Sequence, residues 1–312
     1  MKAGRVHKLG GPEVITVDDV ARPKPGTGEM LIRVAAAGVG PWDALLRSGA
    51  SVVDVALPLT LGSDLSGVVE EVGPGVTNFK PGDAIYGVTN ANFCGAYAEY
   101  SVVSGGMVAS KPAHLSYLES ASVPVVAVTA WQMLFDYAKA QPGQTVLIHG
   151  AAGNVGAFAT QLARYAHLQI YATASAADAD FVRSLGAANV IDHKATPFES
   201  AVPPLDIVLD TVGGETRLRS YAVLKPGGIL VSAVSPITEP PDPRGVRSVF
   251  FLVEVTTERL NALNPLLANG TLKTQVGTVL PLQQAPLAHE MLAGAPHKRG
   301  KIVLNITPEM NR

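Results

Sequence analysis

The stretch TVLIHGAAGNVG, residues 145 to 156, joins a short apolar run to three glycines at Gly150, Gly153 and Gly156. The run TVLIH has the length and composition of a buried strand, and a helical pattern begins at Asn154. Gly150 suits a sharp turn, Gly153 lets the backbone approach a bulky anion, and Gly156 lets the helix pack closely on the strand. With the free N–H groups of the helix start, which include Val155, this predicts a pyrophosphate site.

The spacing here is G-x-x-G-x-x-G rather than G-x-G-x-x-G, so the prediction of a dinucleotide site depends on the surrounding pattern. From about residue 123, helical and strand-like segments alternate, from VTAWQMLFDYAKA (128–140) to SVFFLVE (248–254). This alternation predicts right-handed crossovers and a parallel sheet covered on both faces. Residues 1–122 instead contain short strand-like runs between Gly- and Pro-rich turns, which is typical of an irregular β-barrel or sandwich.

Bulk composition limits the partners. The 312 residues exceed the usual single core, so two domains are expected. A net charge of −2 without a basic stripe argues against nucleic acid as a partner. No apolar signal core is present, and the run 122–135 is too short to span a bilayer, so no membrane association and a cytoplasmic protein are expected. The charged content of 16% favours a compact enzyme or an oligomer, and we expect a homodimer.

The end of the strand QIYATAS, residues 169–175, indicates which dinucleotide is bound. A ribose with a free 2′-hydroxyl usually meets an Asp or Glu there, and a 2′-phosphate would be repelled by one. Residues 174–177 read ASAA, and Ser175 can donate a hydrogen bond to a phosphate oxygen or, alternatively, cap a helix. His193 and Lys194 follow the next strand. These features favour NADP(H), although Asp178 and Asp180 lie just beyond and no arginine occupies the loop.

An ordered set of motifs extends over nearly the whole chain: GVGPWDALLRSG, LGSDLSGVVEEVGPGV, FKPGDAIYG, GAYAEY, VTAW, HGAAGNVG, DTVGG, LKPGG and GKIVL. This set resembles the medium-chain dehydrogenase/reductase superfamily, and within it the zinc-free quinone oxidoreductase (zeta-crystallin-like) branch. The resemblance implies an α/β protein with a GroES-like β-barrel catalytic domain at 1–122, completed by 266–312. It also implies a Rossmann NADP-binding domain, a doubly wound parallel sheet, at 123–265.

The resemblance further implies which residues line the cofactor beyond the glycine turn and Ser175. They are Thr129, His193, Thr211, Val212, Ser232, Ala233, Val234, Phe250, Phe251, Leu252 and Lys301. Lys301 is expected to reach the phosphates or the substrate pocket. Structural roles in the Rossmann core or in a strand that joins the domains are the alternative for each of them.

Zinc-dependent members of the superfamily carry a cysteine and a histidine in two segments that differ here. This sequence has Gly40 and Pro41 in the first segment and Ser63 in the second, and its only cysteine is Cys94. Without thiolate and imidazole ligands a tetrahedral zinc site has nothing to hold it, so no metal site is predicted.

The remaining possibility is hydride transfer to an acceptor that needs no metal, such as an α,β-unsaturated carbonyl or a quinone. The predicted substrate pocket consists of residues in the barrel loops: Trp42, Asp43, Leu46, Tyr86, Phe93 and Tyr97. Packing under the loops is an equal alternative for these side chains. Similar quinone reductases often have Asn where Gly40 stands, which favours an enone or enal slightly over a quinone. A zinc-free ketone or alcohol oxidoreductase and an NADP-binding regulatory or structural protein stay open as alternatives.

Overall fold

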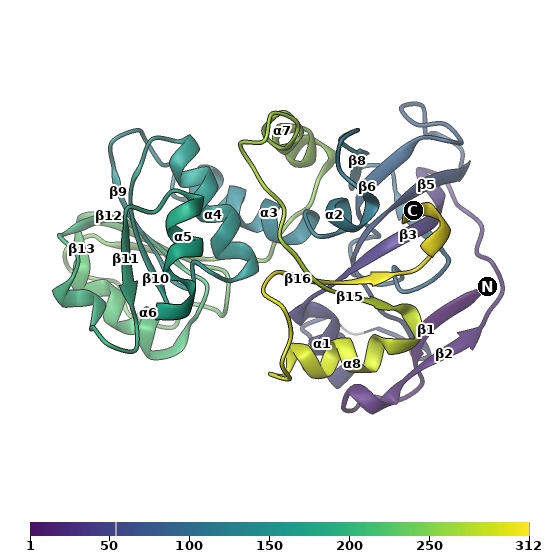
Figure 1. Ribbon diagram of the computed structural model, residues 1–312, viewed down its shortest axis with the longest axis horizontal. Coiled ribbons are helices and arrows are strands. Elements are labelled where there is room, and N and C mark those ends of the chain that lie inside the picture. Colours follow the sequence, from purple (N-terminus) through teal and green to yellow (C-terminus); the bar gives the residue numbers. More distant parts are fainter. Residues whose placement is uncertain (54, 312) are drawn as a thin grey trace. The chain divides into compact units, whose positions relative to one another are not determined.

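The computed structural model describes residues 1–53 and 55–311, which form two compact units (Figure 1). The first unit comprises Met1–Val125, Val255–Gly270 and Thr274–Arg312. The second comprises Val126–Glu254 and Thr271–Lys273. The dinucleotide domain was expected to extend to residue 265, whereas α7 (Thr257–Ala268) belongs to the first unit.

Hydrogen bonds explain where α7 packs. The hydroxyl of Tyr86 donates to the carbonyl of Leu260, at 3.2 Å, and to Asn264 Oδ1, at 2.8 Å. The hydroxyl of Thr257 donates to the carbonyl of Val108, at 2.6 Å. Tyr86 and Val108 both lie in strands of the first unit. Hydrophobic spacing along the sequence does not predict these contacts with α7.

The first unit is built around a seven-stranded sheet in the order β15-β16-β3-β5-β6-β8, with β7 also paired to β3, and a three-stranded sheet β2-β1-β4. The strands are β1 (Lys2–Val6), β2 (Ile15–Asp19), β3 (Glu29–Val39), β4 (Leu59–Thr60), β5 (Asp64–Val72), β6 (Ala84–Val88), β7 (Tyr100–Ser104), β8 (Val108–Ser110), β15 (Val276–Pro281) and β16 (Lys301–Asn305). The helices, besides α7, are α1 (Pro41–Ser48), α2 (Tyr117–Ala121), α8 (Ala285–Leu292) and the short 3₁₀ turns Pro12–Val14, Leu282–Gln284 and Pro308–Asn311.

Strand β3 is the centre of this unit. It pairs with β5, β7 and β16, and nearly all of its residues are buried, which explains its continuous apolar sequence. Because β16 pairs antiparallel with β3, the last strand completes the sheet that the first third of the chain begins. The predicted return of the C-terminal segment to the first domain is therefore seen in the structure.

The second unit contains a six-stranded parallel sheet in the order β11-β10-β9-β12-β13-β14 (Figure 1). Its strands are β9 (Thr145–Ile148), β10 (Gln169–Ala174), β11 (Asn189–Asp192), β12 (Leu205–Asp210), β13 (Leu224–Ser232) and β14 (Arg247–Phe250). Its helices are α4 (Asn154–Tyr165), α5 (Ala179–Leu185), α6 (Gly214–Ser220), the π-helix Gln132–Tyr137 and the 3₁₀ turns Ala176–Asp178, Phe198–Ser200 and Tyr221–Val223. Helix α3 (Pro124–Trp131) contains the boundary between the units.

The strand order reverses between β9 and β12. From β9 the chain adds β10 and β11 on one side, and from β12 it adds β13 and β14 on the other. Right-handed crossovers then put α4 and α5 on one face of the sheet and α6 on the opposite face. The doubly wound sheet predicted from the alternating pattern is confirmed, and its switch point lies beside β9, whose carboxyl end carries the glycine turn.

Candidate functional site

The glycine turn closes tightly between β9 and α4. Gly150 has a φ of 66°, and a Cβ there would lie 2.7 Å from Thr211 Oγ1. A Cβ on Gly156 would lie 2.2 Å from the carbonyl oxygen of Gly150, so only glycine lets the helix approach the turn. Gly153 caps α4, and the first-turn N–H groups of Asn154 and Val155 have no partner within the helix. This is the arrangement predicted to hold a pyrophosphate.

A cavity of about 290 Å³ lies at the carboxyl ends of the strands beside this turn. Five residues predicted to bind the cofactor line it: Gly150, Gly153, Ser175, His193 and Val212. The remaining lining residues were not predicted as a group: His149, Ala152, Thr173, Ala174, Asp178, Thr196, Pro197, Phe198, Thr216 and Arg219. The structure thus brings together side chains from four strand ends, as expected for a ligand at a topological switch point.

Polar groups in this cavity carry both signs of charge. The Ser175 hydroxyl donates to Asp178 Oδ2, at 2.7 Å, because the 3₁₀ turn Ala176–Asp178 folds that carboxylate back toward the strand end. His193 Nδ1 lies 2.9 Å from the carbonyl oxygen of Ala174 and donates to it, which leaves Nε2 as the other polar atom of the ring. From the sequence, Asp178 was expected to lie just beyond the pocket, but the turn places it in the wall.

Arg219 adds a cation to the same wall. Its Nε and Nη2 donate to the two carboxylate oxygens of Glu199, at 2.5 and 2.7 Å, and its guanidinium lies 5.1 Å from the centroid of the Phe198 ring. This bidentate pair fixes the plane of the guanidinium. Sequence reasoning missed Arg219, because nothing in the local pattern of α6 distinguishes it from a solvent-exposed charge.

His149 is the buried polar residue at the base of the cavity. Its ring lies between the hydroxyls of Thr173, 3.1 Å from Nδ1, and Ser220, 3.0 Å from Nε2. The Ser220 hydroxyl donates to the carbonyl of Thr216, so it must accept from Nε2–H, and Nδ1 accepts from Thr173. Burial lowers the pKa of His149 to about 4, which keeps the ring neutral at physiological pH.

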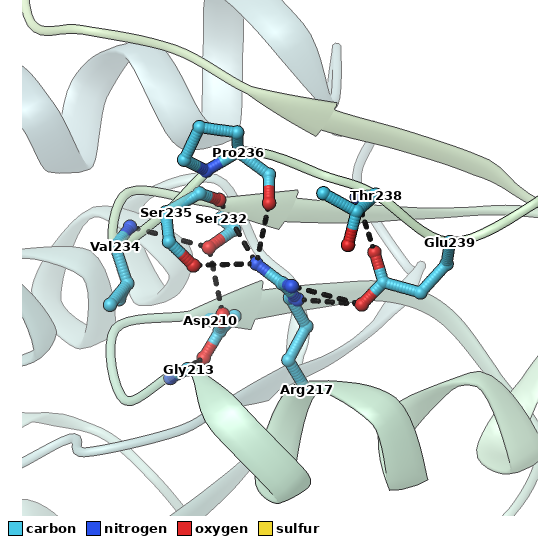
Figure 2. A network of polar contacts seen from close by, with 9 residues as sticks. All are labelled: Asp210, Gly213, Arg217, Ser232, Val234, Ser235, Pro236, Thr238 and Glu239. Carbon is cyan, nitrogen blue, oxygen red and sulfur yellow. Dashed lines mark hydrogen bonds and ion pairs between the residues drawn. The ribbon is translucent and has the colours of Figure 1, made fainter.

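The turns after β12 and β13 are tied together by Asp210, which is fully buried. Its Oδ1 accepts from the backbone N–H of Gly213, at 2.7 Å, and its Oδ2 accepts from the Ser232 hydroxyl, at 2.8 Å (Figure 2). Its Oδ1 also accepts from the backbone N–H of Val212, at 3.0 Å. The backbone N–H of Ala233 donates to the Asp210 carbonyl, at 3.1 Å. Both segments that the resemblance assigned to the cofactor, 211–212 and 232–234, are therefore held by one carboxylate.

Other residues assigned to the cofactor lie outside the cavity. Thr129 is buried in α3. Phe250 ends β14, Phe251 packs on Tyr137 with ring centroids 4.5 Å apart, and Leu252 is exposed. The segment SVFFLVE is a strand only as far as Phe250, because β13, its neighbour in the sheet, ends at Ser232, which pairs with Phe250.

Lys301 lies in the first unit at the start of β16. Its Nζ is 2.9 Å from Asp64 Oδ2, and both side chains are buried. A Cβ on Gly40 would lie 3.2 Å from this Nζ, so Gly40 leaves room for the ammonium group. The charge of Lys301 is thus already balanced by Asp64.

The residues predicted for the substrate side lie at several separate places in the first unit. The rings of Trp42 and Phe93 meet edge to face, 6.1 Å apart, and both are partly exposed. Leu46 lines a separate apolar cavity of about 460 Å³ formed by Leu9, Gly49, Ser51, Val52, Val53, Val55 and Leu57. Tyr86 and Tyr97 are fully buried, and Tyr86 is bonded to α7 as described above.

Asp43 and Tyr97 belong to a buried polar chain. Asp43 Oδ2 accepts from the Gly40 N–H, at 2.9 Å, and from the Tyr97 hydroxyl, at 3.1 Å. The ring of His289 is 3.4 Å from the same hydroxyl and accepts from Arg47 Nε, at 3.1 Å. Burial raises the pKa of Asp43 to about 7 and lowers that of His289 to about 4. These groups stabilise the packing of α1 on α8.

The two segments that carry zinc ligands in the zinc-dependent enzymes that this sequence resembles contain Gly40, Pro41 and Ser63 here. Over residues 1–53 and 55–311, no three His, Cys, Asp or Glu side chains are grouped so that they could hold a metal ion. In that same part of the chain no helix is both long and apolar enough to cross a membrane.

Two protein families and a set of curated relatives match this chain. Residues 26–113 match the alcohol dehydrogenase GroES-like domain family, and residues 185–304 match the zinc-binding dehydrogenase family. Quinone oxidoreductase of Mus musculus is 32% identical, over 97% of this chain and 97% of its own length. The chain belongs to the medium-chain dehydrogenase/reductase superfamily.

Solved structures of this superfamily share the whole fold. The quinone oxidoreductase from Coxiella burnetii has a TM-score of 0.90 at 33% identity, covering 98% of this chain and 99% of that one. The Escherichia coli quinone oxidoreductase complexed with NADPH has a TM-score of 0.87 at 27% identity, covering 97% of this chain and all of that one. This medium-chain dehydrogenase/reductase therefore has a GroES-like domain and a Rossmann domain, as predicted, and is an NAD(P)H-dependent oxidoreductase.

Proposed function

We propose that this protein is a zinc-independent, NADPH-dependent reductase that delivers hydride to the β-carbon of a small α,β-unsaturated carbonyl compound. The observation that carries the proposal is the glycine turn and its cavity, combined with zinc-site segments that hold Gly40, Pro41 and Ser63. When bound, NADPH supplies the hydride from its nicotinamide ring.

The residues present fit a dinucleotide. A side chain at Gly150 would collide with Thr211, and a Cβ at Gly153 would meet only the Gly150 carbonyl oxygen, at 3.2 Å. With glycine at both positions the backbone stays accessible, and the N–H groups of Asn154 and Val155 can donate to the pyrophosphate. The walls formed by Pro197 and Phe198 suit a flat apolar base.

Three observations bear on the choice of NADPH. Ser175 and His193 lie in the wall where the adenosine ribose is expected, and the exposed Lys194 follows directly. The relative from Escherichia coli was solved with NADPH. Asp178 opposes a 2′-phosphate in the same wall, so we expect a preference for NADPH that is moderate rather than absolute.

The substrate class follows from what the first unit can and cannot supply. Gly40, Pro41 and Ser63 stand where thiolate and imidazole ligands would be needed, so we expect no bound metal ion to polarise a carbonyl. Addition to the conjugated alkene is then the easier reaction, because the developing charge spreads over the enolate. Gly40 offers no side-chain hydrogen bond to a quinone oxygen. Quinone reduction is the second candidate, favoured by the names of the relatives.

Isotope labelling tests the reaction directly. The purified protein is incubated with a cyclic enone, an enal and 1,4-benzoquinone, using NADPH deuterated at the transferred position in ordinary water, and then unlabelled NADPH in heavy water. We expect a saturated product labelled at the β-carbon in the first case and at the α-carbon in the second. Label on the carbinol carbon of an allylic alcohol would refute the proposal and indicate carbonyl reduction.

Three further outcomes would change this assignment. Hydroquinone formation without enone turnover would move the substrate class to quinones. Tight NADPH binding without oxidation by any acceptor would favour a regulatory or structural protein. A zinc ion bound stoichiometrically, whose removal by exhaustive chelation abolished turnover, would refute the metal-independent chemistry.

A further inference from the structure

A long loop, residues 233–246, joins β13 to β14 and starts at the carboxyl end of β13. Connections of this length usually serve a function or lack order. Here, polar contacts fix the loop at two separate places.

The first place is Arg217 of α6. Its Nε and Nη2 lie 3.1 and 2.9 Å from Glu239 Oε1, and its Nη1 donates to the carbonyl and the hydroxyl of Ser235, at 2.9 and 2.8 Å (Figure 2). Nη1 also lies 3.2 Å from the carbonyl oxygen of Pro236. The two charged side chains are only 8% and 15% exposed, so this pair is not a solvent-screened surface contact. These contacts tie the segment 235–239 to α6.

The second place is Arg244, at the other end of β13. Its guanidinium donates to the carbonyl groups of Tyr221, at 2.7 Å, and Leu224, at 3.2 Å, and pairs with Asp242, at 2.6 Å. Leu224 is the first residue of β13, whereas Ser232 is the last. One loop is therefore anchored at both ends of the same strand by arginines of similar bonding capacity.

Only one of these anchors lies where a dinucleotide would bind. Within the cavity, Ser175 and His193 follow β10 and β11, which lie on the adenosine side of the switch point. A dinucleotide that crosses the switch point puts its nicotinamide half over the carboxyl ends of β12 and β13. Arg217 follows the Asp210-fixed turn after β12 and holds the segment that follows Ser232 (Figure 2).

We propose that Arg217, acting through Glu239 and Ser235, is a positioning residue for the nicotinamide half of the cofactor; this inference rests on the proposed dinucleotide-dependent function. The contact orders the segment 235–239 before the cofactor arrives, so binding does not have to order it. Ordering the backbone of two residues on binding lowers the affinity about tenfold or more.

The test uses the full-length protein and calorimetric titration with NADPH, NADH and adenosine 2′,5′-bisphosphate, a fragment that carries only the adenosine half. Arg217→Met keeps the aliphatic bulk and removes every hydrogen bond. We expect the Kd of NADPH and of NADH to rise together by about tenfold or more, and the Kd of the fragment to change by less than about twofold. Arg244→Met is the matched control, for which all three values should stay within about twofold.

Several results would overturn the proposal. Unchanged NADPH affinity in folded Arg217→Met would do so, and so would equal weakening of NADPH and the fragment, because that pattern indicates general damage to the domain. An equal effect of Arg244→Met would show that any anchor of the loop suffices. If Arg217→Met does not fold, the test uses Glu239→Ala, which changes the less buried partner of the pair. The same changes in the Kd of NADPH, NADH and the fragment are then expected. If the wild-type protein binds neither NADPH nor NADH, the proposed function itself fails.

Discussion

Acidification should destabilise the Rossmann unit through His149. The ring is fully buried, between Thr173 and Ser220, and burial lowers its pKa to about 4 from an ordinary value of 6.5. Between these two pH values His149 is protonated in the unfolded chain and neutral in the folded chain. The contribution of the neutral ring to the free energy of unfolding is therefore full above pH 6.5 and is lost as the pH falls toward 4. Lowering the pH from about 7.5 to about 5 reduces the free energy of unfolding by about 2 kcal/mol.

The chain offers a reporter for this unit. It has two tryptophans, of which Trp131 lies in the second unit and Trp42 in the first. In a Trp42→Phe background, urea unfolding followed by Trp131 fluorescence gives the free energy of unfolding of the Rossmann unit. His149→Gln removes the titrating ring, so the comparison is between the pH dependences of the two proteins.

We expect the difference in unfolding free energy between the two proteins to shift by about 2 kcal/mol over this pH range. The variant starts less stable at neutral pH, because it loses ring contacts with Phe198, and loses less on acidification. Parallel pH curves for the two proteins would refute the conclusion that His149 is neutral because it is buried.

Three further predictions use the same chain. Asp43→Asn should flatten the pH dependence of the unfolding free energy of the first unit. Burial raises the pKa of Asp43 to about 7, so its contribution to stability is full below about pH 4 and is lost as the pH rises through 7. Urea unfolding followed by Trp42 fluorescence in a Trp131→Phe background measures this. Gly153→Val should weaken NADPH binding in calorimetry while the protein stays folded, since a Cβ there meets only the Gly150 carbonyl, at 3.2 Å; unchanged affinity would contradict the pyrophosphate site. Ser175→Asp should lower the ratio of NADPH to NADH affinity by at least about tenfold, and an unchanged ratio would place the 2′-phosphate elsewhere.

The sequence predicted the fold well where local chemistry determines it. The run 145–156 gave the strand, turn and helix, because Gly150 and Gly156 occupy positions that exclude a side chain. The alternating pattern likewise gave the six-stranded parallel sheet. The domain boundary was less accessible, since α7 joins the first unit through Tyr86, far away in the sequence.

The candidate site was predicted only in its backbone outline. Gly153, Ser175 and His193 follow strand ends, and position in a parallel sheet is enough to gather them. Asp178 and Arg219 were not predicted to line the cavity, because a 3₁₀ turn and a pairing with Glu199 direct their side chains. Such contacts depend on tertiary packing, which spacing along the chain does not encode.

The pairing of β16 with β3 also constrains the order in which a ribosome can produce this fold. Strand β3 is synthesised long before its partner at Lys301–Asn305, and Asp64 meets Lys301 only after that later strand has emerged. Nearly all of the second unit, Val126–Glu254, is by contrast one uninterrupted segment. The Rossmann unit can therefore fold while the GroES-like unit still exposes the edge of β3, and a nascent chain stalled before residue 301 would present that edge to other chains.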